Sequence, residues 1–180
     1  SLPNIITVAD YKPAIVTRVL GGHGSETQLL GEFYKERRYV VPYEKIPAMV
    51  IKAFVAAEDD SFFQHQGVNF VSMLRALIAD LKAGSAVQGG STITQQVVKS
   101  LLLTSEKSLT RKIKEVILAG RIEKNLTKEQ ILYLYLNQIY LGHGAYGVQA
   151  ASISYFDKEV SDISLAEAAV LAGLPQAPSK

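Results

Sequence analysis

A change in the spacing of apolar residues near Pro47 constrains what this sequence can fold into. Before it, residues 5–41 are rich in Ile, Val, Thr and Tyr and are interrupted by glycines, a pattern that predicts two or three short strands. From Ile51 onward, apolar residues recur at the three- and four-residue spacing of amphipathic helices. We therefore expect a β-rich N-terminal segment over 1–45 and a mainly helical domain over 46–180.

Several further segments show the helical period and are bounded by Gly, Pro, Ser or Thr. They cover residues 68–82, 92–103, 109–124, 128–140, 148–156 and 165–174. In the first of them the apolar stripe consists of Phe70, Met73, Leu74, Leu77, Ile78 and Leu81. Such a stripe suits an ordinary core helix and a membrane-surface helix equally well.

Composition excludes several classes of protein. The net charge is +2 and the basic residues are scattered, which argues against a nucleic-acid partner. There is no cysteine, and His23, His65 and His143 lie far apart, so no thiolate or histidine metal site is expected. The longest apolar runs are too short to span a membrane, and the first residues have no signal-peptide pattern. The Pro-rich stretch 175–178 reads as a linker, so we expect a segment of a longer protein.

Three acidic residues, Glu58, Asp59 and Asp60, end the first predicted helix. Acids at a helix C-terminus face the negative end of the helix dipole, and the simplest interpretation is a solvated helix end. Glu58, however, shares a face with Ile51 and Val55, so we expect it to be partly buried. Burial beside an adverse dipole raises the proton affinity of a carboxylate, as a general base requires. Both interpretations stay open on spacing alone.

Residues 89–99 carry two overlapping signals. Thr92 and Gln95 match a capping box, which predicts a helix N-terminus at this point. Thr92, Gln95, Gln96 and Lys99 also share one helical face, and a polar face beside a helix N-terminus favours phosphate oxygens. Capping alone does not explain Lys99.

A second carboxylate, Glu115, follows Arg111 by one helical turn. An exposed Arg–Glu pair would be worth only about 0.3–0.5 kcal/mol, and this order along the helix is the weaker one. Leu118 and Ile122 lie on the same face, which indicates that Glu115 points inward into a partly buried, cationic setting.

Two other motif matches carry no functional prediction. Residues 142–147 fit G-x-G-x-x-G, but a helical pattern precedes them where a dinucleotide site needs a buried strand. Residues 125–127 fit the glycosylation sequon, yet Thr127 reads better as a helix cap with Gln130.

Taken in order, these segments resemble the successive motifs of the peptidoglycan glycosyltransferase domain of class A penicillin-binding proteins and monofunctional transglycosylases, over about residues 28–179. Two positions depart from the family pattern: Tyr133 replaces an acidic residue, and Asn69 stands where aspartate is common. The matching residues are Glu58, Asp59, Phe62, His65, Gly67, Gly90, Ser91, Thr92, Thr94, Gln95, Gln96, Lys99, Arg111, Lys112, Glu115, Ile131, Leu132, Tyr135, Leu136, Asn137, Gly144, Gly147, Val148, Ala150, Ala151, Tyr155 and Phe156.

The resemblance implies a lysozyme-like helical lobe and a smaller, membrane-facing lobe around 68–105, with a cleft between them. It implies elongation of a glycan strand from lipid II with inversion at the anomeric carbon. Glu58 would be the general base on the acceptor 4-hydroxyl, and Glu115 would assist departure of undecaprenyl pyrophosphate. A divalent cation, Mg²⁺ or Mn²⁺, or a cationic side chain would share that second role, and no organic cofactor is expected.

Other residues of the motifs are expected to bind substrate. They are Asp59, Phe62, His65, Ser91, Thr92, Gln95, Gln96, Lys99, Arg111, Lys112 and Asn137. The residues expected to contact the membrane are Phe70, Met73, Leu74, Leu77 and Leu81. The implied partners are lipid II, the growing lipid-linked strand and the outer face of the bacterial cell membrane, with an anchor before Ser1. A transpeptidase domain after Lys180 is left open.

Two rival functions remain at this point. A lysozyme-like hydrolase or lytic transglycosylase would cleave the finished polymer with one acidic residue and would need no cradle for pyrophosphate. A non-catalytic module that binds cell wall or membrane would use Glu58 and Glu115 only as solvated or paired surface acids.

Overall fold

The computed structural model describes residues 8–21, 28–33, 36–83, 90–103 and 109–176. Its helices are α1 (Ala48–Glu58), α2 (Phe70–Ala83), α3 (Ile93–Leu102), α4 (Leu109–Asn125), α5 (Lys128–Gln138), α6 (Val148–Phe156) and α7 (Leu165–Gly173). The prediction of a mainly helical fold is confirmed. None of the helices in the described ranges is long and apolar enough to cross a lipid bilayer.

Local capping explains where several helices begin and end. The capping boxes predicted at Thr92 and Thr127 are both present, with each threonine oxygen accepting a backbone N–H three residues on. The helix predicted from residue 68 begins at Phe70, because the Asn69 side chain accepts the Ser72 N–H at 2.9 Å. The helix predicted to reach residue 140 ends at Gln138, because Ile139 has an extended backbone conformation.

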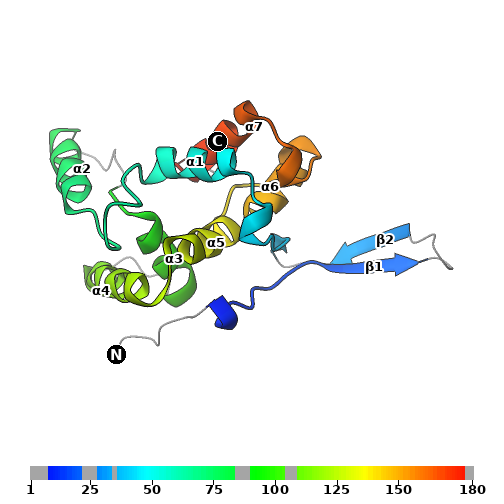
Figure 1. Ribbon diagram of the computed structural model, residues 1–180, viewed down its shortest axis with the longest axis horizontal. Helices are drawn as coiled ribbons and strands as arrows, with labels where there is room; N and C mark the ends of the chain where they lie inside the picture. The colour runs from blue at the N-terminus through cyan, green and yellow to red at the C-terminus, as the bar shows by residue number, and fades with distance from the viewer. Residues whose placement is uncertain (1–7, 22–27, 34–35, 84–89, 104–108, 177–180) are drawn as a thin grey trace.

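The strands predicted in the N-terminal region are β1 (Thr17–Gly21), β2 (Gln28–Phe33) and β3 (Arg37–Arg38). The first two form an antiparallel hairpin that extends away from the helices (Figure 1). The third pairs in parallel with β4 (Ala145–Tyr146), a strand that the sequence did not predict. The domain boundary at residues 45 and 46 stays a prediction.

The glycine-rich segment 142–147 is a turn rather than a nucleotide-binding loop. Gly142, Gly144 and Gly147 have positive φ angles, which glycine adopts without strain, and His143 has a φ of 49°. The turn leads into and out of β4, and Gly147 precedes α6. This geometry accounts for the glycines without a cofactor.

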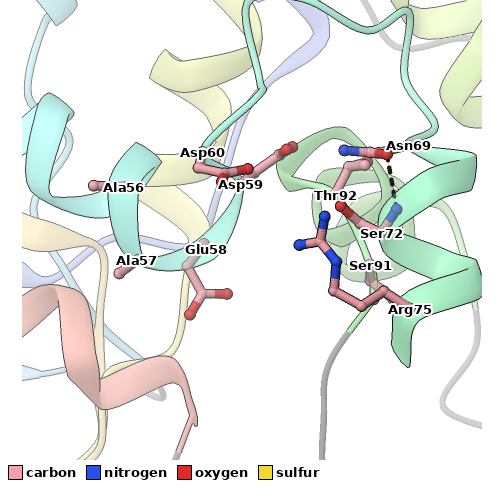
Figure 2. A pocket seen from close by; sticks show the side chains of 11 residues that line it. Ala56, Ala57, Glu58, Asp59, Asp60, Asn69, Ser72, Arg75, Ser91 and Thr92 are labelled. Carbon is pink, nitrogen blue, oxygen red and sulfur yellow. Dashed lines mark hydrogen bonds between the residues drawn. The ribbon is translucent and has the colours of Figure 1, made fainter. Parts of the chain in front are cut away.

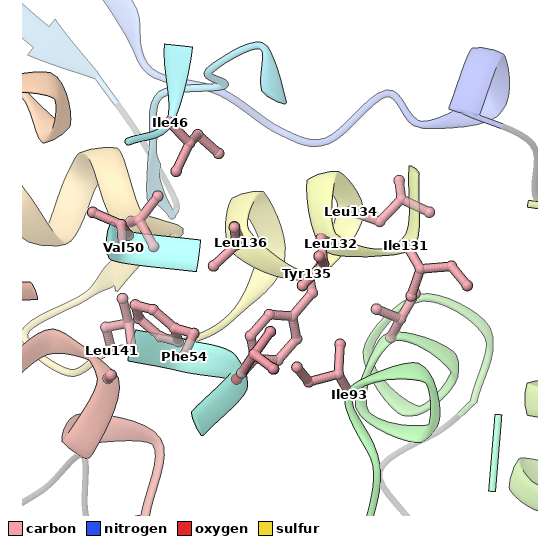
Figure 3. Close-up of a cluster of buried hydrophobic side chains, with 14 of the residues drawn as sticks. Ile46, Val50, Phe54, Ile93, Ile131, Leu132, Leu134, Tyr135, Leu136 and Leu141 are labelled. Carbon is pink, nitrogen blue, oxygen red and sulfur yellow. The ribbon is translucent and has the colours of Figure 1, made fainter. Parts of the chain in front are cut away.

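Helix α5 lies at the centre of the helical body, between α1 and the α3–α4 pair (Figure 1). Nearly all of its side chains from Ile131 to Asn137 are buried, which is typical of a core helix. Phe54 of α1 and Ile93 of α3 pack around it (Figure 3). Burial of each large apolar side chain of this kind contributes about 1.5–3 kcal/mol.

Arg38 and Asn137 tie the N-terminal region to this core. The Arg38 guanidinium is 1% exposed and donates from Nε to the Asn137 carbonyl oxygen at 3.1 Å and from one terminal nitrogen to the Ala14 carbonyl oxygen at 3.0 Å. The Asn137 side chain accepts the Val41 N–H at 2.8 Å and donates to the carbonyl oxygens of Val41 and Tyr133. The amide of Asn137 is thus used by the fold.

We predict that Gly67→Ala destabilises the protein by about 1–3 kcal/mol, because Gly67 has a φ of +89°. A Cβ there would also lie 2.7 Å from the Ala119 carbonyl oxygen, which is backbone and cannot move aside easily. Denaturant unfolding measures the change. Gly120→Ala in α4 is the control: a Cβ at that position meets nothing within 4 Å, so the same experiment should show a gain of about 0.8–1 kcal/mol. Equal stability of Gly67→Ala and the wild type would contradict this account.

Candidate active site

Glu58, the last residue of α1, faces a polar pocket of about 180 Å³. We call it the Glu58 pocket; its lining is Ala56, Ala57, Glu58, Asp59, Asp60, Asn69, Ser72, Arg75, Gly90, Ser91 and Thr92. In Figure 2 the Glu58 carboxylate points into the open space, and Arg75 of α2 extends its guanidinium from the opposite side. The half-buried position expected of Glu58 is confirmed.

A second and larger cavity of about 550 Å³ lies beside α3. We call it the Lys99 groove; its lining is Glu36, Gln96, Lys99, Ser100, Leu103, Arg111, Tyr135, Gln138, Ile139, Tyr140 and Tyr146. Gln96 connects the two cavities, because its Nε2 donates a hydrogen bond to Glu58 Oε2 at 2.8 Å. The Glu58 carboxylate therefore borders one cavity, and Lys99 and Arg111 border the cavity next to it. Gln96 lies between the two.

Asp59 holds the end of α1 against the start of α3. Its Oδ1 and Oδ2 lie 2.9 Å and 2.8 Å from His65 Nε2, and Oδ2 accepts the Ile93 N–H at 3.0 Å. The Gly67 N–H donates to His65 Nδ1 at 3.2 Å, which assigns the ring proton to Nε2 and makes His65 a donor to Asp59. Asp59 and His65, both predicted to bind substrate, are thus used to position Glu58.

The four residues predicted to form one polar face on α3 divide between several environments. Thr92 Oγ1 donates to the Gly67 carbonyl oxygen at 2.6 Å, and the fully buried Gln95 side chain turns back to accept the Thr92 N–H. Gln96 and Lys99 line the groove. Thr92 lines the Glu58 pocket and Gln95 lies in the core, so Gln96 and Lys99 are the two of the four that line the groove.

Glu115 points inward, as its spacing on α4 predicts, and is only 2% exposed. Its ion-pair partner is Lys112, whose Nζ lies 2.5 Å from Glu115 Oε1 and 2.8 Å from Ser91 Oγ. Because Ser91 lines the Glu58 pocket, Glu115 reaches that pocket through Lys112 and Ser91. Arg111 lines the Lys99 groove.

Phe62 lies in the core instead of a cavity wall. Its side chain is fully buried, and the Lys128 ammonium sits 4.3 Å from the centre of its ring. Phe62 does not line the Glu58 pocket or the Lys99 groove, and the Asn137 side chain is buried in the same way. Direct substrate contacts by Phe62 and Asn137 are therefore not part of the mechanism proposed for this chain.

Two residues of the predicted membrane stripe on α2, Phe70 and Leu74, are exposed. Phe70 is 72% and Leu74 58% exposed, and Met73 is half-buried. The side chains of Leu77 and Leu81 lie outside the described part of the chain. In Figure 1 α2 stands apart from the helical body. Phe70 and Leu74 thus do not belong to the hydrophobic core.

Sequence reasoning missed Arg75 on the pocket and Tyr140 and Tyr146 on the groove. Arg75 lies on α2, the helix of the apolar stripe. Its place opposite Glu58 depends on how α2 is set against α1, which no local pattern encodes. Tyr146 reaches the groove through β4, whose pairing partner is more than a hundred residues away in the chain.

No three His, Asp or Glu side chains within the described ranges converge in a group that could hold a metal. One oxygen of the Glu115 carboxylate is already hydrogen-bonded to the Lys112 ammonium. The divalent cation implied by the family resemblance stays a prediction.

The site joins a carboxylate that lines a pocket to a neighbouring groove with two cationic side chains, on a mainly helical scaffold. The chain belongs to the transglycosylase family, whose model matches residues 26–180. The family resemblance and the prediction of a glycosyltransferase are thus confirmed.

Individual relatives agree with this assignment. The chain is 49% identical over 180 residues to Penicillin-binding protein 1A of Aquifex aeolicus, covering 100% of this chain and 24% of that protein. Penicillin-binding protein 1A of Escherichia coli is 47% identical over 99% of this chain and 21% of its own length. Penicillin-binding protein 1F of Bacillus subtilis is 46% identical over 96% and 24%. The chain spans about a quarter of the length of these relatives.

We predict that Asp59→Asn lowers the free energy of unfolding by about 1–3 kcal/mol, because the amide is uncharged and its NH2 group in place of Oδ1 would face the Nε2–H of His65, which is also a donor. Urea unfolding monitored by circular dichroism measures the loss. Asp60→Asn, an exposed neighbour on the same pocket, should change stability by less than about 0.5 kcal/mol. Equal effects of the two substitutions would show that Asp59 does not hold the helices together.

Proposed function

We propose that this chain is a peptidoglycan glycosyltransferase that adds the disaccharide of lipid II to a growing lipid-linked glycan strand. One observation carries the proposal: Gln96 hydrogen-bonds Glu58 of the Glu58 pocket and also lines the groove that holds Lys99 and Arg111. A base and a site for an anionic leaving group are thereby adjacent, as transfer from a pyrophosphate-linked sugar requires.

Glu58 acts as the general base. Its Oε2 is held by Gln96, and Glu58 lines the pocket that a sugar hydroxyl can enter, across from Arg75 (Figure 2). The carboxylate takes the proton of the acceptor 4-hydroxyl while the hydroxyl oxygen bonds to the anomeric carbon of the donor. The bond from that carbon to the pyrophosphate oxygen breaks, and the configuration inverts.

Cationic side chains receive the leaving group. The departing oxygen of the pyrophosphate gains negative charge, and charge-assisted hydrogen bonds stabilise such a charge more strongly than neutral ones. Lys99 is exposed in the groove and Arg111 lines the same wall. Glu115 fixes the Lys112 ammonium beside Ser91, at the edge of the Glu58 pocket. In this proposal Glu115 assists the departure of pyrophosphate by holding the Lys112 ammonium in place.

The cationic groove also separates this function from its rivals. Hydrolysis of finished glycan by water has no anionic leaving group and would leave Lys99 and Arg111 without a role. A binding module would need neither the hydrogen bond that orients Glu58 nor the ion pair between the buried Glu115 and Lys112.

We predict that Glu58→Gln lowers the rate of polymerisation of labelled lipid II by about 10²–10⁴-fold, because the amide cannot take up a proton. Thermal unfolding should change little, since Gln keeps the shape of the side chain. Glu129→Gln, which removes an exposed carboxylate from the first turn of α5, is the control and should leave the rate unchanged. Wild-type protein that releases fragments from finished peptidoglycan and ignores lipid II would favour the hydrolase.

We further propose that the chain works at the outer face of the bacterial membrane, with α2 in the headgroup region. Lipid II is membrane-bound, so the enzyme must approach the lipid surface. The exposed apolar residues of α2 are Phe70, Val71, Leu74 and Ile78. They lie on the helix that also carries Arg75 of the Glu58 pocket, which would bring the pocket close to the lipid. In the whole protein, a membrane anchor and a transpeptidase domain would complete the molecule.

We predict that Phe70→Asp reduces flotation with phosphatidylglycerol vesicles about tenfold or more, because insertion of one Phe side chain is worth about 1.5–3 kcal/mol. Leu165→Asp is the matched control. Leu165 is 66% exposed, but it begins α7, far from α2 in Figure 1, and its replacement should leave flotation unchanged. Equal flotation of Phe70→Asp and the wild type would rule out this membrane face.

A further inference from the structure

Tyr135 carries a buried hydroxyl that the fold itself does not use. The side chain is 2% exposed, and its ring packs edge-on against Phe54 with the ring centres 6.1 Å apart (Figure 3). The hydroxyl oxygen is almost completely buried and has no hydrogen-bond partner within the described ranges, although Tyr135 lines the Lys99 groove. A buried hydroxyl without a partner lowers stability, so this one calls for an explanation.

The surroundings of Tyr135 connect it to the active site. Its side chain lines the Lys99 groove next to Gln96, the residue that binds Glu58. Burial raises the pKa of the Tyr135 hydroxyl well above its usual value, and the negative charges of Glu58 and Asp59 raise it further. The hydroxyl therefore stays protonated and is available as a hydrogen-bond donor beside the catalytic base.

The charges around the Tyr135 hydroxyl determine which kind of oxygen can accept its hydrogen bond. Glu58 and Asp59 repel an anionic oxygen at this point, whereas Lys99 and Arg111 attract one elsewhere in the groove. A neutral oxygen of a sugar meets no such repulsion, and a buried donor discriminates strongly for a ligand that can accept its hydrogen bond.

We propose that the Tyr135 hydroxyl donates a hydrogen bond to a neutral sugar oxygen of the bound substrate, at the place where the groove meets Glu58. This assignment rests on the proposed function. Tyr135 is thus a substrate-binding residue of the reaction: it orients the sugar next to the carboxylate that removes the proton, and the substrate satisfies the hydroxyl that the protein leaves without a partner.

Tyr135→Phe tests the proposal, because it removes one oxygen atom and leaves the packing of the ring intact. We expect kcat/KM for lipid II polymerisation to fall about tenfold, the effect of losing one hydrogen bond in the transition state. The melting temperature should stay the same or rise, because a buried hydroxyl without a partner is lost.

Tyr155→Phe is the matched control. The Tyr155 hydroxyl donates to the Leu141 carbonyl oxygen at 2.8 Å, and Tyr155 lines neither the Glu58 pocket nor the Lys99 groove. This variant should melt at a lower temperature and keep wild-type kcat/KM. The two phenylalanine variants are thus expected to show opposite effects.

Two results would overturn the assignment of Tyr135. One is wild-type kcat/KM in Tyr135→Phe, and the other is a fall in melting temperature as large as that of Tyr155→Phe, which would show that the hydroxyl has a partner in the protein. Wild-type protein that makes no polymer from lipid II would overturn the proposed function as well, so the two failures are distinguishable.

Discussion

The Asp59 carboxylate is the contact on which the site depends. It accepts from His65 Nε2 and from the N–H of Ile93, so it joins the end of α1 to the start of α3. Glu58 precedes it directly in the chain, and Gln96 lies within the first turn of α3. Fixing Asp59 therefore brings Glu58 and Gln96 within hydrogen-bond distance at 2.8 Å. The residue adjacent to the proposed base is in this way responsible for its position.

Acidic and basic side chains border both cavities at this junction. The acidic end of α1 faces the Glu58 pocket, and the cationic residues of α3 and α4 face the Lys99 groove. Helix α5 lines the Lys99 groove with Tyr135 and Gln138, and the charges of Glu58 and Asp59 also act on Tyr135. The order of the charges matches a transfer in which a proton leaves at one end and a pyrophosphate at the other. Family membership and the geometry of the site thus support the same reaction.

Patterns local in sequence predicted much of this structure. The helical period gave the helices, the capping boxes at Thr92 and Thr127 gave two of their N-termini, and the apolar face of α4 predicted that Glu115 points inward. Motif membership could not distinguish residues that line a cavity from residues that hold the fold, so Phe62 and Asn137 were assigned to the substrate although they are buried. Arg75, Tyr135 and strand β4 were missed because their roles arise from contacts between segments far apart in the chain.

The most direct test of this account is a structure of the protein bound to lipid II or to an analogue that cannot react. The account predicts the pyrophosphate in the Lys99 groove, in contact with Lys99 and Arg111, and a sugar hydroxyl about 2.6–3.2 Å from the Glu58 carboxylate. A pyrophosphate bound outside this groove, or sugars that lie beyond hydrogen-bond reach of Glu58, would contradict it.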